Sequence, residues 1–243
     1  TEIRSKITDL IGTGNAEMFY SAYRKNMITS RDIDSIKKWG FNSIRLPMHY
    51  NLFTLSVEKE PVKGKNTWID EGFALTDSLL KWCENNQIYL ILDLHAAPGG
   101  QGNDRPIADV DTNKPQLWES DANIDKTIAL WKKLSKRYSK EKWIGGYDLI
   151  NETNYKMDGN LPLRELYFAL TKEIRKVDKN HIIFIEGNQF ANDFTGLTPP
   201  WDDNMVYSFH KYWNPTTVET IQKYLVLRDE NNIPLWMGES GEN

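Results

Sequence analysis

The sequence is poor in the features that mark several large classes of protein. Its 243 residues contain a single cysteine, Cys83, so an intramolecular disulfide is excluded. No apolar run approaches the roughly 20 residues of a membrane span, and the N-terminus lacks the charged-then-apolar layout of a signal peptide. The net charge is only −4, which gives no basic field for nucleic acid or an anionic membrane. We therefore expect neither a nucleic-acid nor a membrane partner.

Strand-like and helix-like stretches alternate along the chain, which predicts an α/β fold in one domain covering residues 1–243. Before residue 29 no periodicity is clear. Periodicity alone does not choose between a doubly wound sheet and a barrel. The expected strands are 41–47, 88–94, 146–150, 181–185, 205–209 and 235–237, and the expected helices are 29–40, 68–86, 124–138, 162–177 and 216–228, with Thr29 and Thr216 at capping-box positions.

Polar side chains stand where each expected strand ends. Nothing in folding requires these residue types on one rim, whereas a barrel enzyme gathers its catalytic groups at the C-terminal ends of its strands. Glu152 and Glu239 are alike in setting, and two facing carboxyl groups are the minimum equipment for breaking a glycosidic bond. The residues at the six strand ends are Arg45, His95, Asn151 with Glu152, Glu186, His210 with Tyr212, and Glu239.

Aromatic residues make up 12% of the chain, and several occur in polar, loop-like stretches. Trp118 and Trp213 are two such residues, and we include both among the expected substrate contacts. Aromatic faces stack on pyranose rings, although a loop tryptophan can equally anchor its loop on the core. No metal site is predicted, because the calcium-like run from Asp109 has Lys114 and Ser120 where glycine and glutamate are required. No cofactor is predicted either, because Gly12-Thr13-Gly14 lacks the third glycine of a nucleotide-binding fingerprint and has no strand before it.

The ordered motifs around these strand ends resemble glycoside hydrolase family 5, the cellulase-like retaining β-glycanases. The matching motifs are Gly40-Phe41-Asn42-Ser43-Ile44-Arg45-Leu46-Pro47, Leu92-Asp93-Leu94-His95, Asn151-Glu152, His210-Lys211-Tyr212 and Gly238-Glu239. The resemblance spans residues 40–240 and implies a (β/α)8 barrel, with Glu152 as acid/base and Glu239 as nucleophile. It also implies that Asn151 binds the sugar 2-hydroxyl, and that His95 and His210 bind substrate and orient the acid.

Elementary electrostatics supports the two carboxylate roles. Arg45 and Tyr212 are expected to hold Glu239 as a carboxylate, while the negative charge of Glu239 favours a protonated Glu152. Glu186, at the end of its own strand, is expected either to line the cleft or to be a structural rim acid, and it stays outside the catalytic pair.

The chain departs from the family pattern in three places. Thr153 stands where the family usually has proline, no clear first barrel strand precedes the helix at 29–40, and only four residues follow Glu239. We therefore expect a barrel without a clear first and eighth strand, in which the strands near Arg45 and Glu239 are edges. A fragment, or a barrel completed by a second chain, would explain this count.

The leading functional prediction is a retaining endo-β-1,4-glucanase acting on β-glucan oligo- or polysaccharide. An exo-β-1,3-glucanase stays open, because the run from His95 to Gln101 resembles a loop of that subgroup. Mannan and xyloglucan hydrolases stay open too, as does a carbohydrate-binding barrel fragment without turnover. The family resemblance implies a secreted or periplasmic protein.

Overall fold

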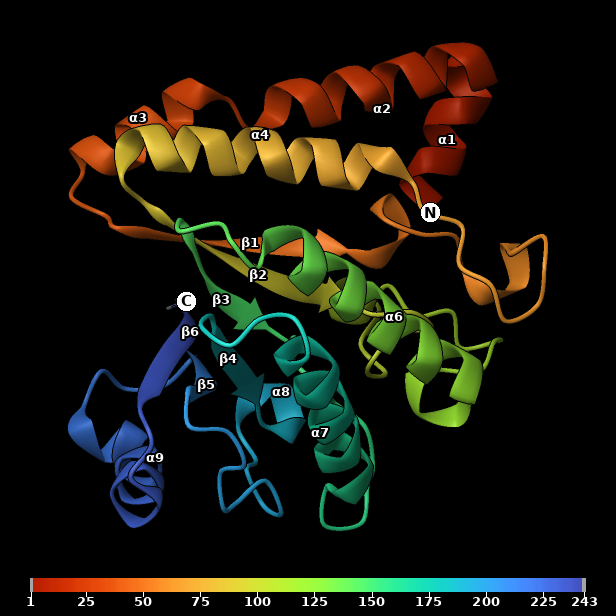
Figure 1. Cartoon of the computed structure of the whole chain (residues 1–243). Helices are drawn as coiled ribbons and strands as arrows, with labels where there is room; N and C mark the ends of the chain where they lie inside the picture. The colour runs from red at the N-terminus through yellow and green to blue at the C-terminus, as the bar shows by residue number, and fades with distance from the viewer. Residues whose placement is uncertain (1, 242–243) are drawn as a thin grey trace.

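Six parallel strands pair in chain order, β1-β2-β3-β4-β5-β6, in a computed structural model that describes residues 2–241. Consecutive parallel strands need a crossover, and helices on the outer face supply most of them (Figure 1). The strands are β1 (Ser43–His49), β2 (Tyr89–Ala96), β3 (Ile144–Asp148), β4 (Ile182–Glu186), β5 (Met205–Tyr212) and β6 (Leu235–Gly241). The sheet curls into part of a (β/α)8 barrel, so the predicted fold class is confirmed.

Helices cover the convex face of this sheet (Figure 1). The helices of residues 2–241 are α1 (Glu2–Ile11), α2 (Thr13–Met27), α3 (Ser30–Lys38), α4 (Asp70–Asn86), α5 (Arg105–Ala108), α6 (Asp121–Tyr138), α7 (Leu161–Arg175), α8 (Asn188–Ala191) and α9 (Val218–Asn231). The short helices α5 and α8 lie in the loops that follow β2 and β4 and are not part of this outer layer. Short 3-10 turns are η1 (Tyr50–Leu52), η2 (Val57–Lys59) and η3 (Leu117–Glu119). No helix within residues 2–241 is long and apolar enough to cross a membrane.

The two faces of the sheet carry different side chains, because neighbours along a strand point to opposite faces. On β2, Leu92 belongs to the main apolar core shared with the helices, whereas Ile91 packs with Phe184 and Val206 in a smaller cluster. On the face of Ile91, two residues further along β2, stands the buried acid Asp93. The inner face therefore changes from apolar to charged toward the C-terminal ends of the strands.

The N-terminal segment was not predicted and forms two helices, α1 and α2. Their apolar residues do not lie on one buried stripe: Met18 and Tyr23 are exposed, and Ala16 is the buried residue of α2. That distribution explains why no helical period stands out in the sequence. At the next helix the capping prediction is confirmed, since the Asp32 carboxylate accepts a bond from the Thr29 amide.

The predicted start of the last helix was wrong. Helix α9 begins at Val218 with Thr217 as its N-cap, so the Thr216 to Glu219 spacing is not the capping pair. The first residue of a helix is the least certain part of a sequence-based assignment, because neighbouring threonines offer equivalent caps.

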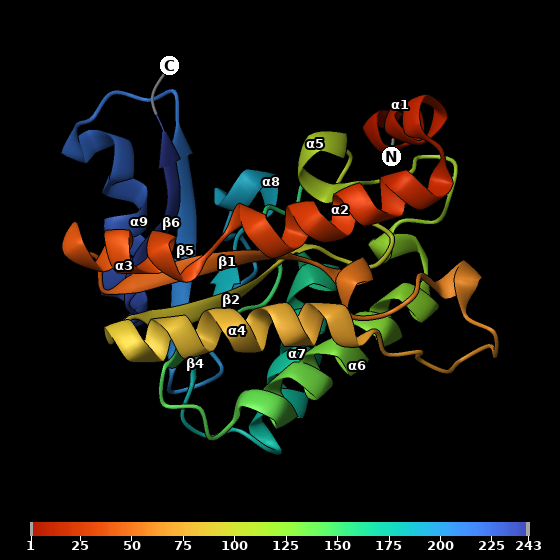
Figure 2. The ribbon, with the colours of Figure 1, turned by 90° about the horizontal axis from the view of Figure 1, so that it is seen from above.

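Strands β1 and β6 are the two edges of the sheet. Seen from above, β5 and β6 run steeply across the direction of β1 and β2 (Figure 2), as accumulated strand twist requires. No further strand lies beside either edge within residues 2–241, which confirms the expected lack of a first and an eighth strand in that range. The curl points the C-terminal ends of all six strands toward one rim.

Candidate active site

Arg45 of β1 is the hub of the charged layer at this rim. Its guanidinium donates to Asp148 at 2.9 Å, to Glu186 at 2.9 Å and to Glu239 at 2.5 Å, and lies 3.2 Å from Asp93. Burial alone would lower the pKa of Arg45, but these four carboxylates raise it well above its ordinary value. A permanent cation therefore ties together β1, β2, β3, β4 and β6.

Glu239 of β6 is fixed through both of its carboxylate oxygens. Oε1 accepts from Arg45, and Oε2 accepts from the Tyr212 hydroxyl at 2.8 Å. Burial would raise the pKa of Glu239, yet the positive charges of His210 and Arg45, with the Tyr212 hydrogen bond, lower it on balance. The group is therefore held as an oriented carboxylate, the form that a nucleophile requires.

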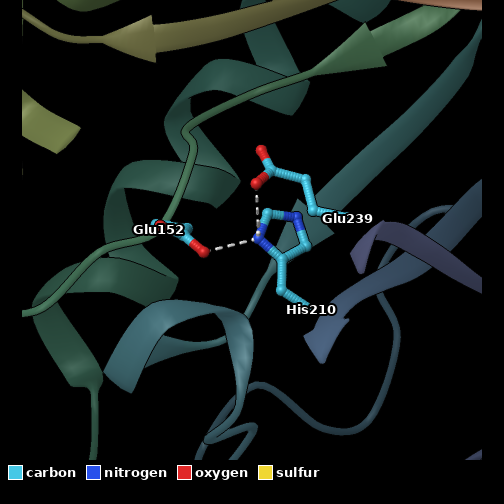
Figure 3. Close-up of side chains that lie close together, drawn as sticks. All are labelled: Glu152, His210 and Glu239. Carbon is cyan, nitrogen blue, oxygen red and sulfur yellow. Dashed lines mark hydrogen bonds and ion pairs between the residues drawn. The ribbon is translucent and has the colours of Figure 1, made fainter. Parts of the chain in front are cut away.

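His210 of β5 lies between Glu239 and Glu152, whose labelled side chains converge in Figure 3. Its Nδ1 is 2.7 Å from Glu152 Oε1 and 3.8 Å from Glu239 Oε2. One oxygen of each carboxylate and a ring nitrogen of His210 all lie within 4.8 Å of one another. The two carboxylates predicted from the sequence thus face each other across a short gap.

The local backbone makes this approach feasible. The pairing of β5 with β6 shifts register between Phe209 and His210, which places His210 directly opposite Glu239. A Cβ atom on Gly238 would stand 2.9 Å from His210 Nε2 and 2.7 Å from Ser208 Oγ. Glycine at position 238 therefore leaves the space that the imidazole occupies.

Burial also shapes the proton affinity of His210. Loss of hydration alone would lower its pKa, but the Glu186 charge, the hydrogen bond to Glu152 and the Glu239 charge raise it to about 10. His210 is therefore protonated at neutral pH, and it lies beside the gap between the two carboxylates.

Two buried acids of this layer, Asp93 and Asp148, were not predicted from the sequence. Burial raises the pKa of Asp93 to about 6 against the opposing charge of Arg45, and burial with the neighbouring Glu186 charge raises the pKa of Asp148. The available signal was an acidic residue inside an apolar strand, as in Ile91-Leu92-Asp93-Leu94. A buried charge in such a run needs a partner, and Arg45 supplies it.

Glu186 does not line the cleft. Its side chain is 0% exposed, and its carboxylate contacts Arg45, His210 and the backbone of Glu152. Of the two alternatives expected for Glu186, its burial favours the structural acid over the cleft-lining residue, because it stands one layer below the surface, under the two catalytic candidates.

His95 and Asn151 lie beside this layer. His95 is partly exposed and bonds Asp93 through Nδ1 at 2.8 Å; burial lowers its pKa, but Asp93 raises it on balance. Asn151 Oδ1 accepts from Arg45, while its Nδ2 has no hydrogen-bond partner among residues 2–241. Buried Gln101, which the sequence reasoning missed, donates to the backbone oxygens of both His95 and Asn151 and joins their two loops.

The two loop tryptophans have different settings. The Trp118 indole N–H donates to the Gln101 carbonyl at 2.9 Å, and its ring packs on the main core. Trp213 follows Tyr212 at the end of β5, has a left-handed backbone with φ 56°, and is 62% exposed. Trp213 thus offers a free aromatic face, whereas Trp118 anchors a loop.

A polar hollow of about 640 Å³ lies at the loops that follow β2, β3 and β4. Asn154, two residues after Glu152, lines it, together with Tyr155 and Phe190. The Phe190 amide donates to the carbonyl of Thr153, the residue after Glu152, at 3.1 Å. The hollow therefore adjoins the segment that carries Glu152.

Glu152, His210 and Glu239 together present three possible metal-ligand atoms. In this arrangement Glu152 is bonded to His210, Glu239 is bonded to Arg45 and Tyr212, and the Arg45 cation stands beside them. A neighbouring fixed positive charge disfavours a second cation. The donor set suits proton transfer and nucleophilic attack better than metal binding.

Comparison with known families places the chain. A family described as "Cellulase (glycosyl hydrolase family 5)" matches residues 7–243. The chain belongs to glycosyl hydrolase family 5. The match covers every strand of the sheet and all of the strand-end residues described above.

Among curated relatives, this family 5 chain is 33% identical over 213 residues to a beta-xylosidase of Phanerodontia chrysosporium, covering 87% of the chain and 43% of the relative. It is 27% identical over 201 residues to endoglucanase C of Acetivibrio thermocellus (82% and 54%). It is 28% identical over 217 residues to a glucan 1,3-beta-glucosidase of Candida oleophila (85% and 46%). The chain spans about half the length of these relatives.

Solved structures agree with the family 5 fold. A crystal structure described as that of a glycoside hydrolase superposes with a TM-score of 0.71 at 21% identity, covering 87% of this chain and 72% of that one. At this identity the likeness bears on the fold alone.

Proposed function

We propose that this family 5 chain carries the catalytic site of a retaining β-glucan hydrolase, with endo-β-1,4-glucanase as the leading activity. The observation that supports this most is the approach of Glu152 and Glu239, whose nearest oxygens are within 4.8 Å. Retaining enzymes hold their carboxyl groups about 5 to 5.5 Å apart, whereas inverting enzymes need about 6.5 to 9.5 Å to admit a water molecule. The shorter separation favours double displacement.

In the first step of the proposed reaction, a Glu239 oxygen attacks the anomeric carbon and the bond to the leaving oxygen breaks. Glu152 delivers a proton to that oxygen, so the leaving sugar departs as a neutral alcohol. His210, which is protonated and hydrogen-bonded to Glu152 through Nδ1 at 2.7 Å, passes its proton to Glu152 for this transfer. Arg45 and Tyr212 orient Glu239 for attack.

In the second step, water replaces the departed alcohol. Glu152, now a carboxylate, takes a proton from this water, whose oxygen attacks the anomeric carbon and releases Glu239. In the glycosyl–enzyme intermediate Glu239 is an uncharged ester. Glu152 can therefore be a carboxylate, and act as a base, without repulsion from a second negative charge. Two inversions give net retention at the anomeric carbon.

We propose that the sugar is contacted by side chains that have an unused hydrogen-bond donor or an exposed ring. Asn151 Nδ2 is free to donate to the 2-hydroxyl, a bond that strengthens as the transition state forms. His95 offers a partly exposed ring, and Trp213 an exposed face for stacking. The hollow at Asn154 and Phe190 would take sugar units on the leaving-group side, because it adjoins the Glu152 segment.

The linkage preference has two supported candidates. Endoglucanase C as a relative favours β-1,4-glucan, and the glucan 1,3-beta-glucosidase, with the loop from His95 to Gln101, favours β-1,3-glucan. The beta-xylosidase relative adds β-xylosides to the substrates to be tested. A binding-only role is less favoured, because the acid, the nucleophile and the groups that orient them are all present.

The test is incubation with carboxymethyl cellulose, laminarin, mixed-linkage glucan, mannan and xylo-oligosaccharides, with reducing ends counted. The first-formed anomer is followed by NMR. We expect release from a β-1,4-glucan with the β-anomer appearing first. Preferential release from laminarin would favour the β-1,3 activity, whereas binding without release from any of these would contradict a hydrolase.

Secretion, or location in the periplasm, fits action on polymeric glucan and stays a prediction. So does a second chain that pairs with the edge strands β1 and β6. Size-exclusion chromatography with an activity assay tests whether a second chain is needed: a well-behaved monomer with full turnover would contradict that prediction.

A further inference from the structure

Glu186 is a buried carboxylate that the proposed reaction does not consume. Its Oε2 accepts from the Glu152 backbone N–H at 2.7 Å, and its Oε1 accepts from Arg45 Nη2 at 2.9 Å. Oε1 also lies 3.2 Å from His210 Nε2. The Tyr167 hydroxyl bonds both backbone groups of Glu186, at 2.9 Å and 3.2 Å, so the residue itself is fixed.

Glu152 has a backbone conformation that L-residues rarely adopt, with φ 36°. Such a residue persists only where its surroundings over-determine it. The hydrogen bond from the Glu152 N–H to Glu186 is a restraint at that position, and it is charge-assisted and shielded from water. The Glu186 carboxylate also accepts a hydrogen bond from Arg45, which in turn donates one to Glu239.

We propose that Glu186 is a positioning residue: it fixes the acid/base Glu152 through its backbone amide and registers that residue against the Arg45-bound nucleophile. This inference rests on the proposed function. Its geometric basis is that the carboxylate faces the amide of one catalytic residue and the guanidinium that holds the other.

Substitution chemistry makes the role testable. Three donors face Glu186, namely the Glu152 amide, the Arg45 guanidinium and the His210 ring nitrogen. In Glu186→Gln the side chain has one acceptor oxygen and an NH₂ group that is only a donor. At least one of those donors then faces another donor. Glu186→Asp keeps the charge but is shorter by one methylene, so it cannot span the same gap.

Aryl β-cellobiosides of graded leaving-group acidity separate positioning of the acid from general damage. A phenol needs a proton to leave, whereas 2,4-dinitrophenolate leaves without one. We expect Glu186→Gln to lose about 100-fold or more in kcat/KM with the phenyl glycoside, the range of a general acid's contribution, and about 10-fold or less with the dinitrophenyl glycoside. We expect Glu186→Asp to show the same leaving-group dependence.

A second readout is the pH profile. His210 faces Glu152, Glu186, Glu239 and Asp148, and all four carboxylates stabilise its protonated form. Loss of the Glu186 charge in Glu186→Gln should move the alkaline limb of kcat/KM to lower pH, whereas Glu186→Asp should leave that limb nearly in place.

The matched control is Asp178→Asn, another buried acid that pairs with a histidine, His181, and with the Tyr147 hydroxyl. Both variants lose a buried charge, but Asp178 touches none of the catalytic candidates, so only Glu186→Gln should steepen the leaving-group dependence. Circular dichroism and melting curves confirm folding, and Glu186→Asp decides the outcome if Glu186→Gln does not fold.

The outcomes are distinguishable. Wild-type protein without turnover on any glycoside contradicts the proposed function, and the positioning role with it. Wild-type turnover with retention, combined with an equal loss on all leaving groups or no loss in the folded Glu186 variants, contradicts the positioning role alone.

Discussion

Arg45 and Glu239 stand on opposite edge strands of the sheet, yet Arg45 Nη1 is 2.5 Å from Glu239 Oε1. The contact joins β1 to β6 by side chains, where residues 2–241 provide no backbone pairing between them. Both residues are largely withdrawn from water, so the attraction is less screened than at a surface. The nucleophile candidate therefore depends on the curl of the sheet for its charge partner.

Tyr212→Phe should shift the acidic limb of kcat/KM to higher pH. The Tyr212 hydroxyl helps to lower the pKa of Glu239, and the nucleophile works only when ionised. Loss of a hydrogen bond of ~1.5 kcal/mol to a charged group corresponds to about one pH unit. The control is Tyr155→Phe, whose hydroxyl bonds Glu119 instead. An unchanged limb in Tyr212→Phe would refute this assignment.

The folded state should become less stable as the solution becomes alkaline, because the stabilising contribution of protonated His210 is lost. Its folded-state pKa of about 10 lies above the ordinary 6.5, so its contribution is fully present below pH 6.5 and is lost as pH rises through about 10. Chemical unfolding at pH 7 and pH 10 should show a decline on the order of a few kcal/mol that is smaller in His210→Asn. Equal declines in both proteins would argue against a raised pKa.

Gly238→Ala should lose activity through displacement of His210. The added Cβ would stand 2.9 Å from His210 Nε2 and 2.7 Å from Ser208 Oγ, so the imidazole has to shift from the position in which it contacts Glu152. A loss of about 100-fold in kcat is expected, comparable to misplacing a general acid. Gly14→Ala, whose Cβ meets no atom within 4 Å, is the control and should keep full activity. Comparable kinetics in the two variants would show that the close approach at Gly238 has no catalytic consequence.

Phe190→Ala should weaken binding of oligosaccharides that extend past the leaving group. Phe190 lines the polar hollow next to the Glu152 segment. KM for cellopentaose should rise about 10-fold, the effect of losing one stacking contact of roughly 1.4 kcal/mol, while an aryl cellobioside is hardly affected. Phe168→Ala removes an exposed ring that packs on Trp201 and should change neither value. A parallel rise for both substrates would place the effect elsewhere.

Much of this site was predictable because strand ends are readable in sequence. Apolar runs that close on a polar residue located Glu152 and Glu239, and parallel strands bring such ends to one rim. Arg45 instead lies inside β1, and its motif rather than a strand end identified it. Contacts across the sheet were less accessible. Nothing local distinguishes Glu186 facing the cleft from Glu186 buried beneath it, since that depends on the curl that stacks it under Glu152.

The N-terminal helices and the loop tryptophans show the same limit. Helix α2 presents apolar residues on several sides, so its period is masked. Trp118 and Trp213 look alike in sequence. A hydrogen bond to the backbone oxygen of Gln101, 17 residues earlier in the chain, fixes Trp118, whereas Trp213 is exposed. Such outcomes depend on partners that are distant in sequence.

The most direct test of the central claim is covalent trapping with a 2-deoxy-2-fluoro-β-cellobioside that carries an activated leaving group. The fluorine slows hydrolysis of the glycosyl–enzyme bond, so peptide mass spectrometry can locate the sugar. We expect one glycosyl unit per chain, attached to Glu239, with Glu152 unlabelled. Attachment to any other residue, or first-formed product of inverted configuration from the natural glucan, would contradict it.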